Sequence, residues 1–154
     1  MYIAMVITLM LILPIVSIAL EFFARGPGAF DVAIIDKWFV FWAVGVRLFI
    51  AGVRQIVQPR YTAETILGVK SPDAMLIVRE LGIANTAIGS AGLGSLFFSG
   101  WTLPLAVVGA TFYGLAGINH FMHKGRNKLQ NAAMTSDFFA SAILLTILVA
   151  MKPT

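Results

Sequence analysis

Cysteine is absent from this chain of 154 residues, so disulfides, thiolate metal ligands and cysteine nucleophiles are all excluded. Charge is also scarce: Lys, Arg, Asp and Glu together make up 12% of the residues, whereas a soluble domain carries about a quarter. The sequence contains no Gly-rich phosphate loop, Ser-His-Asp order or nucleotide fingerprint. Apolar side chains are correspondingly frequent, at 59% of the residues. This composition indicates an integral membrane protein.

Five apolar segments are long enough to cross a bilayer, for which a helix needs about 20 residues. They are roughly residues 3–23, 37–57, 74–98, 103–123 and 130–151. No Lys or Arg precedes the first segment and no clean cleavage site follows it, so we interpret it as a retained helix and not as a signal peptide. We therefore predict an all-α fold, a single transmembrane helical domain over 1–154 with about five spans.

Turn signals separate these segments. Gly-Pro-Gly within 24–31 is a strong turn, and the long connection 58–73 has room for a short surface helix that ends at Gly68. The third span begins with Ser71 as a cap and Pro72 at the first helical position. We expect the connections to lie at alternating ends, with 58–73 as the one long connection.

Lys and Arg are distributed unequally between the two ends. One end holds six (Arg54, Arg60, Lys70, Lys124, Arg126 and Lys128) and the other holds three (Arg25, Lys37 and Lys152). Because cytoplasmic loops carry the excess of positive charge, we predict a cytoplasmic N-terminus and an external C-terminus.

Small residues mark the faces on which helices pack in lipid. They are frequent in the third, fourth and fifth spans, which we expect to form a close-packed bundle. In the third span, Glu80 shares a face with Ala84, Ala87 and Ala91, so we expect it to point into that bundle. Asn85 lies on the neighbouring face of Gly82, Gly89 and Gly92.

Seven of the polar side chains within the predicted spans, in the cytoplasmic half of the membrane or at its middle, are candidates for a site. They are the candidate ligand or proton site: Arg47, Arg54, Glu80, Asn85, Asn119, His120 and Asp137. Ionisable groups inside a membrane are rare, face the interior and pair with one another. Arg54 can also be explained as an interface anchor, whereas for Arg47 and Asp137 a structural ion pair and a functional site are both open.

We expect Glu80 to be ionised and paired with Arg47, because a lone buried carboxylate would take up a proton. If those two residues are not partners, Asp137 becomes the better partner for Arg47. The two histidines, His120 and His123, have no third ligand at a suitable spacing along the chain, and only folding could bring Glu80 or Asp137 to them, so we predict no metal. The sequence assigns no catalytic residue, implies no cofactor, and argues against nucleic-acid binding.

Three stretches carry a family resemblance: "KWFVFWAVGVRLFIAGVRQIVQP", "VRELGIANTAIGSAGLG" and "YGLAGINHF". Over residues 37 to 150 the chain resembles small bacterial inner-membrane proteins of the DoxX-like kind, and most of all an uncharacterised relative of them. The resemblance implies a four-helix membrane bundle, and some DoxX-like proteins are associated with quinone-linked redox assemblies. The extra N-terminal span departs from that pattern, and no cofactor ligand carries over.

Three functions remain open on the sequence alone. The first is a binding or permeation module for a small ligand, a proton or a lipid. The second is an accessory or scaffold subunit of a larger membrane complex, or a homo-oligomer, in which the charges only fix helix register. The third is a membrane-embedded enzyme that acts on a quinone or lipid, with Glu80 or His120 as acid or base. The expected location is a bacterial inner membrane.

Overall fold

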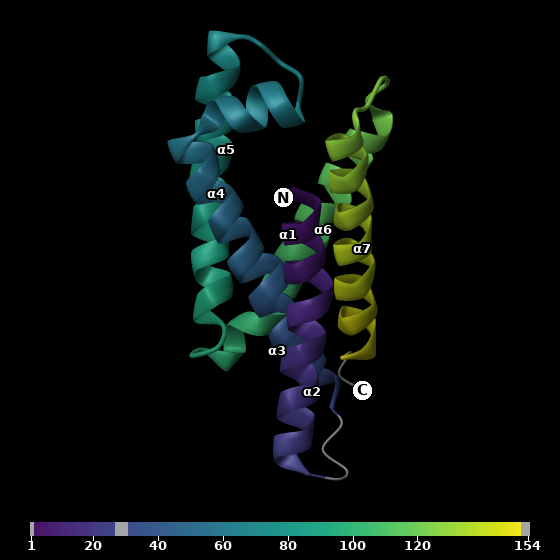
Figure 1. Ribbon diagram of the computed structural model, residues 1–154. Coiled ribbons are helices and arrows are strands. Elements are labelled where there is room, and N and C mark those ends of the chain that lie inside the picture. Colours follow the sequence, from purple (N-terminus) through teal and green to yellow (C-terminus); the bar gives the residue numbers. More distant parts are fainter. Residues whose placement is uncertain (1, 27–30, 152–154) are drawn as a thin grey trace.

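The computed structural model describes residues 2–26 and 31–151, and these residues are almost entirely helical with no strand among them (Figure 1). The first rod is continuous and consists of α1 (Tyr2–Ile7), the π-helix η1 (Thr8–Ile12) and α2 (Leu13–Arg25). The second rod has the same order of segments, with α3 (Val32–Phe39), the π-helix η2 (Val40–Val46) and α4 (Arg47–Val57). The rest are η3 (Tyr61–Ile66), α5 (Pro72–Gly94), η4 (Ser99–Trp101), α6 (Thr102–Met122) and α7 (Lys128–Ala150).

Four of the described helices are long and apolar enough to cross a membrane: Tyr2–Arg25, Val32–Val57, Ser99–Met122 and Lys128–Ala150. The fifth long helix, α5, carries Arg79 and Glu80 near its start and is less apolar. It runs beside α4 over much of its length (Figure 1). The fold is therefore a transmembrane helical bundle with about five spans, as the apolar runs predict.

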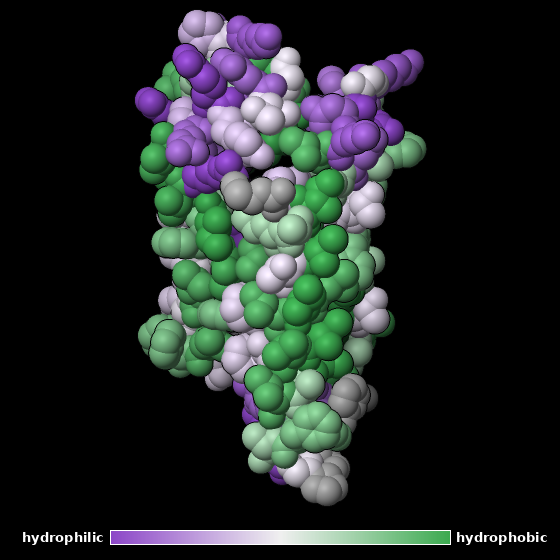
Figure 2. Space-filling model, in the orientation of Figure 1, coloured by the Kyte–Doolittle hydropathy of each residue, from purple (hydrophilic) through white to green (hydrophobic). Residues whose placement is uncertain are grey.

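The long helices form two antiparallel pairs, α4 with α5 and α6 with α7 (Figure 1). The pairs separate at the end where η3 lies, and the first rod begins below that end, between the pairs in this view, and runs lengthwise toward the opposite end (Figure 1). Figure 2 shows hydrophilic residues gathered over this end and a broad hydrophobic band below it. We call it the polar end. Charged residues of the 58–71 and 123–127 connections lie there.

The expectation that the third, fourth and fifth spans pack together is wrong for the third. α5 packs on α4 and η2, and only slightly on α6. Its glycine face makes the contact: a Cβ at Gly89 would lie 2.3 Å from the backbone nitrogen of Phe49, and one at Gly92 would lie 2.5 Å from Gly45 Cα. Backbones this close leave no room for a methyl group, so glycine is required at both positions.

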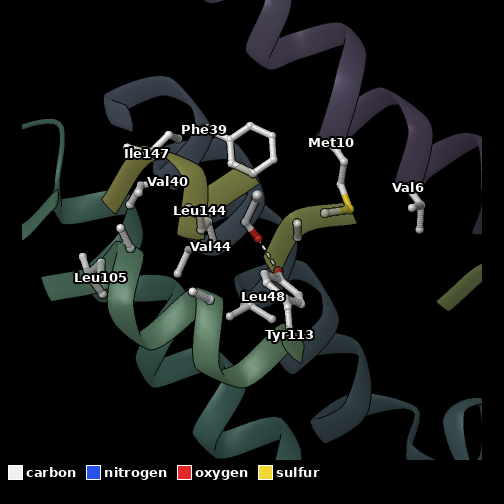
Figure 3. Close-up of a cluster of buried hydrophobic side chains, with 14 residues drawn as sticks. Val6, Met10, Phe39, Val40, Val44, Leu48, Leu105, Tyr113, Leu144 and Ile147 are labelled. Atoms are coloured by element: carbon white, nitrogen blue, oxygen red, sulfur yellow. Dashed lines mark hydrogen bonds between the residues drawn. The ribbon is translucent and has the colours of Figure 1, made fainter. Parts of the chain in front are cut away.

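The predicted contact between the fourth and fifth spans is present, because α6 and α7 pack closely. Ser141 on α7 donates a hydrogen bond to the Ala110 carbonyl oxygen at 2.9 Å. The core between the rods is apolar (Figure 3), with Val40, Val44 and Leu144 fully buried. It packs the two rods against α6 and α7.

The connections agree in part with the expected turns. η3 is the predicted short surface helix, and Gly68 beyond it has φ +74°, which favours glycine. Ser71 is the N-cap residue of α5 and Pro72 occupies its first turn, as expected, but the Ser71 side chain makes no capping hydrogen bond. Most of the Gly-Pro-Gly turn lies outside the described residues, as does Lys152.

Candidate functional site

Arg47 lies at the centre of a buried polar cluster on the polar-end side of the core. Its Nη2 donates to Asp137 Oδ1 on α7 at 2.8 Å and to Ser136 Oγ at 3.0 Å. All three residues are buried. Arg47 begins α4 directly after the π-helix η2, and π-helical turns are rare and are often found at functional sites. The pair joins α4 to α7, which belong to different helix pairs.

Two residues of α6 complete the cluster. The Arg47 guanidinium lies over the ring of Tyr113, with Cζ 4.7 Å from the ring centroid. The Tyr113 hydroxyl donates to the Ala43 carbonyl oxygen, which fixes the ring (Figure 3). His120 Nε2 lies 4.0 Å from the second carboxylate oxygen of Asp137. Asp137 therefore stands between a permanent cation and a titratable imidazole.

A cavity of about 190 Å³ opens beside this cluster, between the two helix pairs. Its apolar wall includes Val6, Leu48 and Phe112. Its polar wall comes from five helices and the η3 connection: Tyr2, Arg47, Arg54, Gln55, Tyr61, Thr62, Asn85, Tyr113, His120 and Asp137. An apolar chamber with a few convergent polar groups is the usual form of a small-molecule site.

Two buried atoms of this wall have no hydrogen-bond partner among the described residues. They are Nη1 of Arg47, a donor, and Oδ1 of Asn85, an acceptor. The amide of Asn85 is held by its other end, because Nδ2 donates to Gln55 Oε1 at 2.8 Å. Unpaired buried polar atoms are uncommon in native proteins and often mark a functional site or a bound water.

Arg54 lies at the edge of the cavity and is only partly buried. Its guanidinium carbon is 3.6 Å from the ring centroid of Tyr61, the first residue of η3. The stacking on Tyr61 does not neutralise its charge. Arg54 is thus an ordered cation at the cavity mouth, and not only an interface anchor.

Of the seven predicted site residues, the fold brings five to this cavity and leaves two outside. Arg47, Arg54, Asn85, His120 and Asp137 all line it. Glu80 and Asn119 are exposed. The expected pairing of Glu80 with Arg47 is wrong, and the partner of Arg47 is Asp137, the alternative that the sequence left open.

The position of Glu80 follows from how α5 lies against α4. Gly82 packs against Gln55 and the Gly52 carbonyl, and Glu80 is two residues, about 3 Å, nearer the polar end. At that level α4 is about to end, at Val57. Arg79 and Glu80 therefore lie near the polar end of the bundle, on the outer face of α5, where their charges can reach water or lipid headgroups.

The sequence prediction does not include four residues of the cluster and its cavity wall: Tyr2, Gln55, Tyr113 and Ser136. Gln55 and Ser136 directly adjoin the predicted residues Arg54 and Asp137, but an uncharged side chain beside a charged one is not by itself a signal. Asp36 is a separate case that the sequence analysis did not single out. It is 1% exposed, its Oδ1 has no hydrogen-bond partner among the described residues, and it lines a second cavity of about 260 Å³ at the opposite end.

No three His, Asp or Glu side chains gather within metal-binding reach of one another in the described part of the chain. Asp137 and His120 alone would supply two ligands, fewer than a zinc site uses. The absence of a metal stays a prediction.

The fold and the buried cluster define a polytopic helical membrane protein with a polar cavity near one end. Residues 2–153 match the model of a family of unknown function, DUF6790, and the chain belongs to that family. No curated protein and no solved structure matches the chain. The family agrees with the expected uncharacterised relative, and the DoxX-like relationship itself stays a prediction.

Proposed function

We propose that the protein is a membrane-embedded binding module for a small amphipathic ligand, and that the ligand occupies the cavity beside Arg47. One observation carries this proposal: a donor on Arg47 and an acceptor on Asn85, both without a partner among the residues that the structure describes, belong to the wall of the same cavity. A buried polar atom without a partner costs about 1–3 kcal/mol. A ligand that pairs with both atoms would recover that cost on binding.

The chemistry of the walls supports an amphipathic ligand. Leu48, Phe112 and Val6 suit an apolar body, and the Arg47–Asp137 pair with His120 suits a polar head. Asp137 lies between the Arg47 guanidinium and the His120 imidazole, and ionisable groups gathered inside a membrane often belong to proton pathways. A proton-coupled form of the same site is therefore included in the proposal.

The test is native mass spectrometry of the purified protein, with two tryptophan substitutions on α6. Ala116 lines the cavity, so Ala116→Trp should fill it and release the co-purifying small molecule. Val107 is exposed on the same helix, so Val107→Trp should retain that molecule. If both variants carry the same species as the wild type, the cavity is not the binding site.

A second candidate function is an accessory subunit of a larger membrane complex, as the DoxX-like resemblance implies. The outer face of α5 supports it, because Glu80, Ala84 and Ala87 are exposed there and small residues favour helix contacts in lipid. Native electrophoresis of gently solubilised membranes should then show a larger complex, and Ala87→Trp should reduce it to the single chain.

Glu80 lies outside the cavity, so His120 is the one remaining acid or base of the two that the enzyme hypothesis named. A bacterial inner membrane stays the proposed location.

A further inference from the structure

We infer that the ligand is a single-chain amphiphile with a carboxylate head, bound with its head in the cavity and its tail along α4. This inference rests on the proposed function and adds the charge and the shape of the ligand. The inference is drawn from the charge balance of the cavity and from a groove that shares two lining residues with the cavity.

The charges of the cavity wall do not cancel. Arg47 and Asp137 neutralise each other at 2.8 Å, and Arg54 adds a positive charge with an aromatic ring as its neighbour. The nearest basic residue along the chain, Arg60, lies 3.5 Å from Glu64 and does not line the cavity. Arg47, Arg54 and Asp137 together give the wall one net positive charge, which one anionic group of a ligand would balance. Water is partly excluded there, so the attraction is stronger than at an open surface.

A groove of about 380 Å³ runs along the outer face of α4, lined by Phe49, Ile50, Val53, Arg54, Val57 and Gln58. Ile50 and Arg54 also line the inner cavity, so these two residues are the boundary between the two spaces. Val57 is 69% exposed, and the groove side of α4 is open to lipid. A chain entering from the bilayer would lie along this apolar face, with its head next to Arg54.

The cavity and the groove suit a small head and a single chain. The cavity of about 190 Å³ admits several water molecules, so a carboxylate with its first few carbons fits this space. A carboxylate also carries the single negative charge that balances the wall. The groove is shallow and is formed by α4 and Gln58 alone, so a chain bound there packs against one helix.

The experiment compares oleic acid, oleyl alcohol and an oleoyl lysophosphatidylglycerol as competitors of a fluorescent fatty acid bound to the purified full chain. The three share one tail, so only the head differs. We expect oleate to bind about tenfold more tightly than the alcohol, as one charged hydrogen bond would provide. The lysophospholipid should be weaker than oleate because of its larger head.

Arg54→Gln should lower the affinity for oleate about tenfold and leave that for oleyl alcohol unchanged. Arg60→Gln is the matched control, because it removes the same charge six residues away from an exposed position outside the cavity. Val53→Trp should fill the groove and weaken both ligands together. The melting temperature of each variant shows whether it has folded.

The outcomes separate the inference from the proposed function. Equal binding of oleate and oleyl alcohol, with both lost in Ala116→Trp, overturns the carboxylate and leaves the cavity as a binding site. Equal losses in Arg54→Gln and Arg60→Gln also overturn the inference, since they reflect general surface charge. Binding that Ala116→Trp leaves unchanged overturns the proposed function itself.

Discussion

The Arg47–Asp137 pair is the residue-scale feature on which the cavity depends. Both side chains are buried, and an arginine cannot shed its charge to escape that environment. Replacing both partners with neutral residues is often tolerated, whereas removing one leaves an uncompensated buried charge. The pair also connects α4 with α7, so its loss would loosen the two helix pairs at the cavity.

We therefore expect Arg47→Gln and Asp137→Asn each to lower the free energy of unfolding in detergent by about 3–5 kcal/mol. The double variant should lose less than the sum of the two. A thermal or denaturant double-mutant cycle measures the coupling. Glu80→Gln is the control and should change stability by less than about 0.5 kcal/mol, as at other surface positions. Strictly additive losses would mean that the two residues are not energetic partners.

At Asp36 we expect the opposite result, a substitution that raises the free energy of unfolding. Its carboxylate is buried with one oxygen unpaired, and burying an unpaired charge is costly. Asp36→Asn keeps the shape and removes the charge, so it should raise the free energy of unfolding by about 1 kcal/mol. The melting temperature in detergent is the measurement. A clear decrease would show that the carboxylate has a partner, such as a bound cation, in the membrane.

At the scale of elements, the sequence predicted the helices better than their contacts. The span predicted at 103–123 is α6 at Thr102–Met122, and the one at 130–151 is α7 at Lys128–Ala150, because apolar runs and their breaks are local signals. The packing of α5 was predicted wrongly because that helix carries both an alanine face and a glycine face. Only a partner decides between them, and Gly45 and Gly52 on the second rod allow the glycine face to approach.

At the candidate site, too, the sequence predicted positions within helices better than contacts between helices. The positions of Arg47 and Asp137 in the membrane were readable from their distance to the helix ends, and so was their need for partners. Which carboxylate meets Arg47 depends on the arrangement of helices far apart in the chain. With α5 on the far side of α4 from α7, Asp137 reaches the arginine and Glu80 does not.

Two leucine substitutions on α5 test this assignment of faces. A side chain at Gly89 would collide with the Phe49 backbone, so Gly89→Leu should cost about 3 kcal/mol or more, at the upper end for overpacking. Ala87 lies two residues away and is exposed, so Ala87→Leu should be nearly neutral. Thermal unfolding in detergent compares the two. The reverse order of stability would mean that the alanine face is the packed one.

At the scale of the whole molecule, the two helix pairs separate at the polar end (Figure 1), and the apolar core packs the second rod against α6 and α7 (Figure 3). The cavity is therefore nearer one membrane surface than the other. An anionic amphiphile would reach it from the leaflet on the polar side. Which leaflet that is depends on the orientation of the protein in the membrane.

The fold and the charge distribution together predict that orientation. The 58–71 and 123–127 connections lie at the same end of the bundle (Figure 1), and six of the nine Lys and Arg counted for the two ends belong to it. Positive loops stay in the cytoplasm, so the polar end and its cavity should face inward.

Alkaline phosphatase, which is active only outside the cytoplasm, should be inactive when fused after Lys70 or Lys128 and active after Thr154. Activity at the first two sites and none at the third would reverse the orientation and keep the fold. Different results at Lys70 and Lys128 would contradict the fold itself, because an even number of spans must separate those two positions.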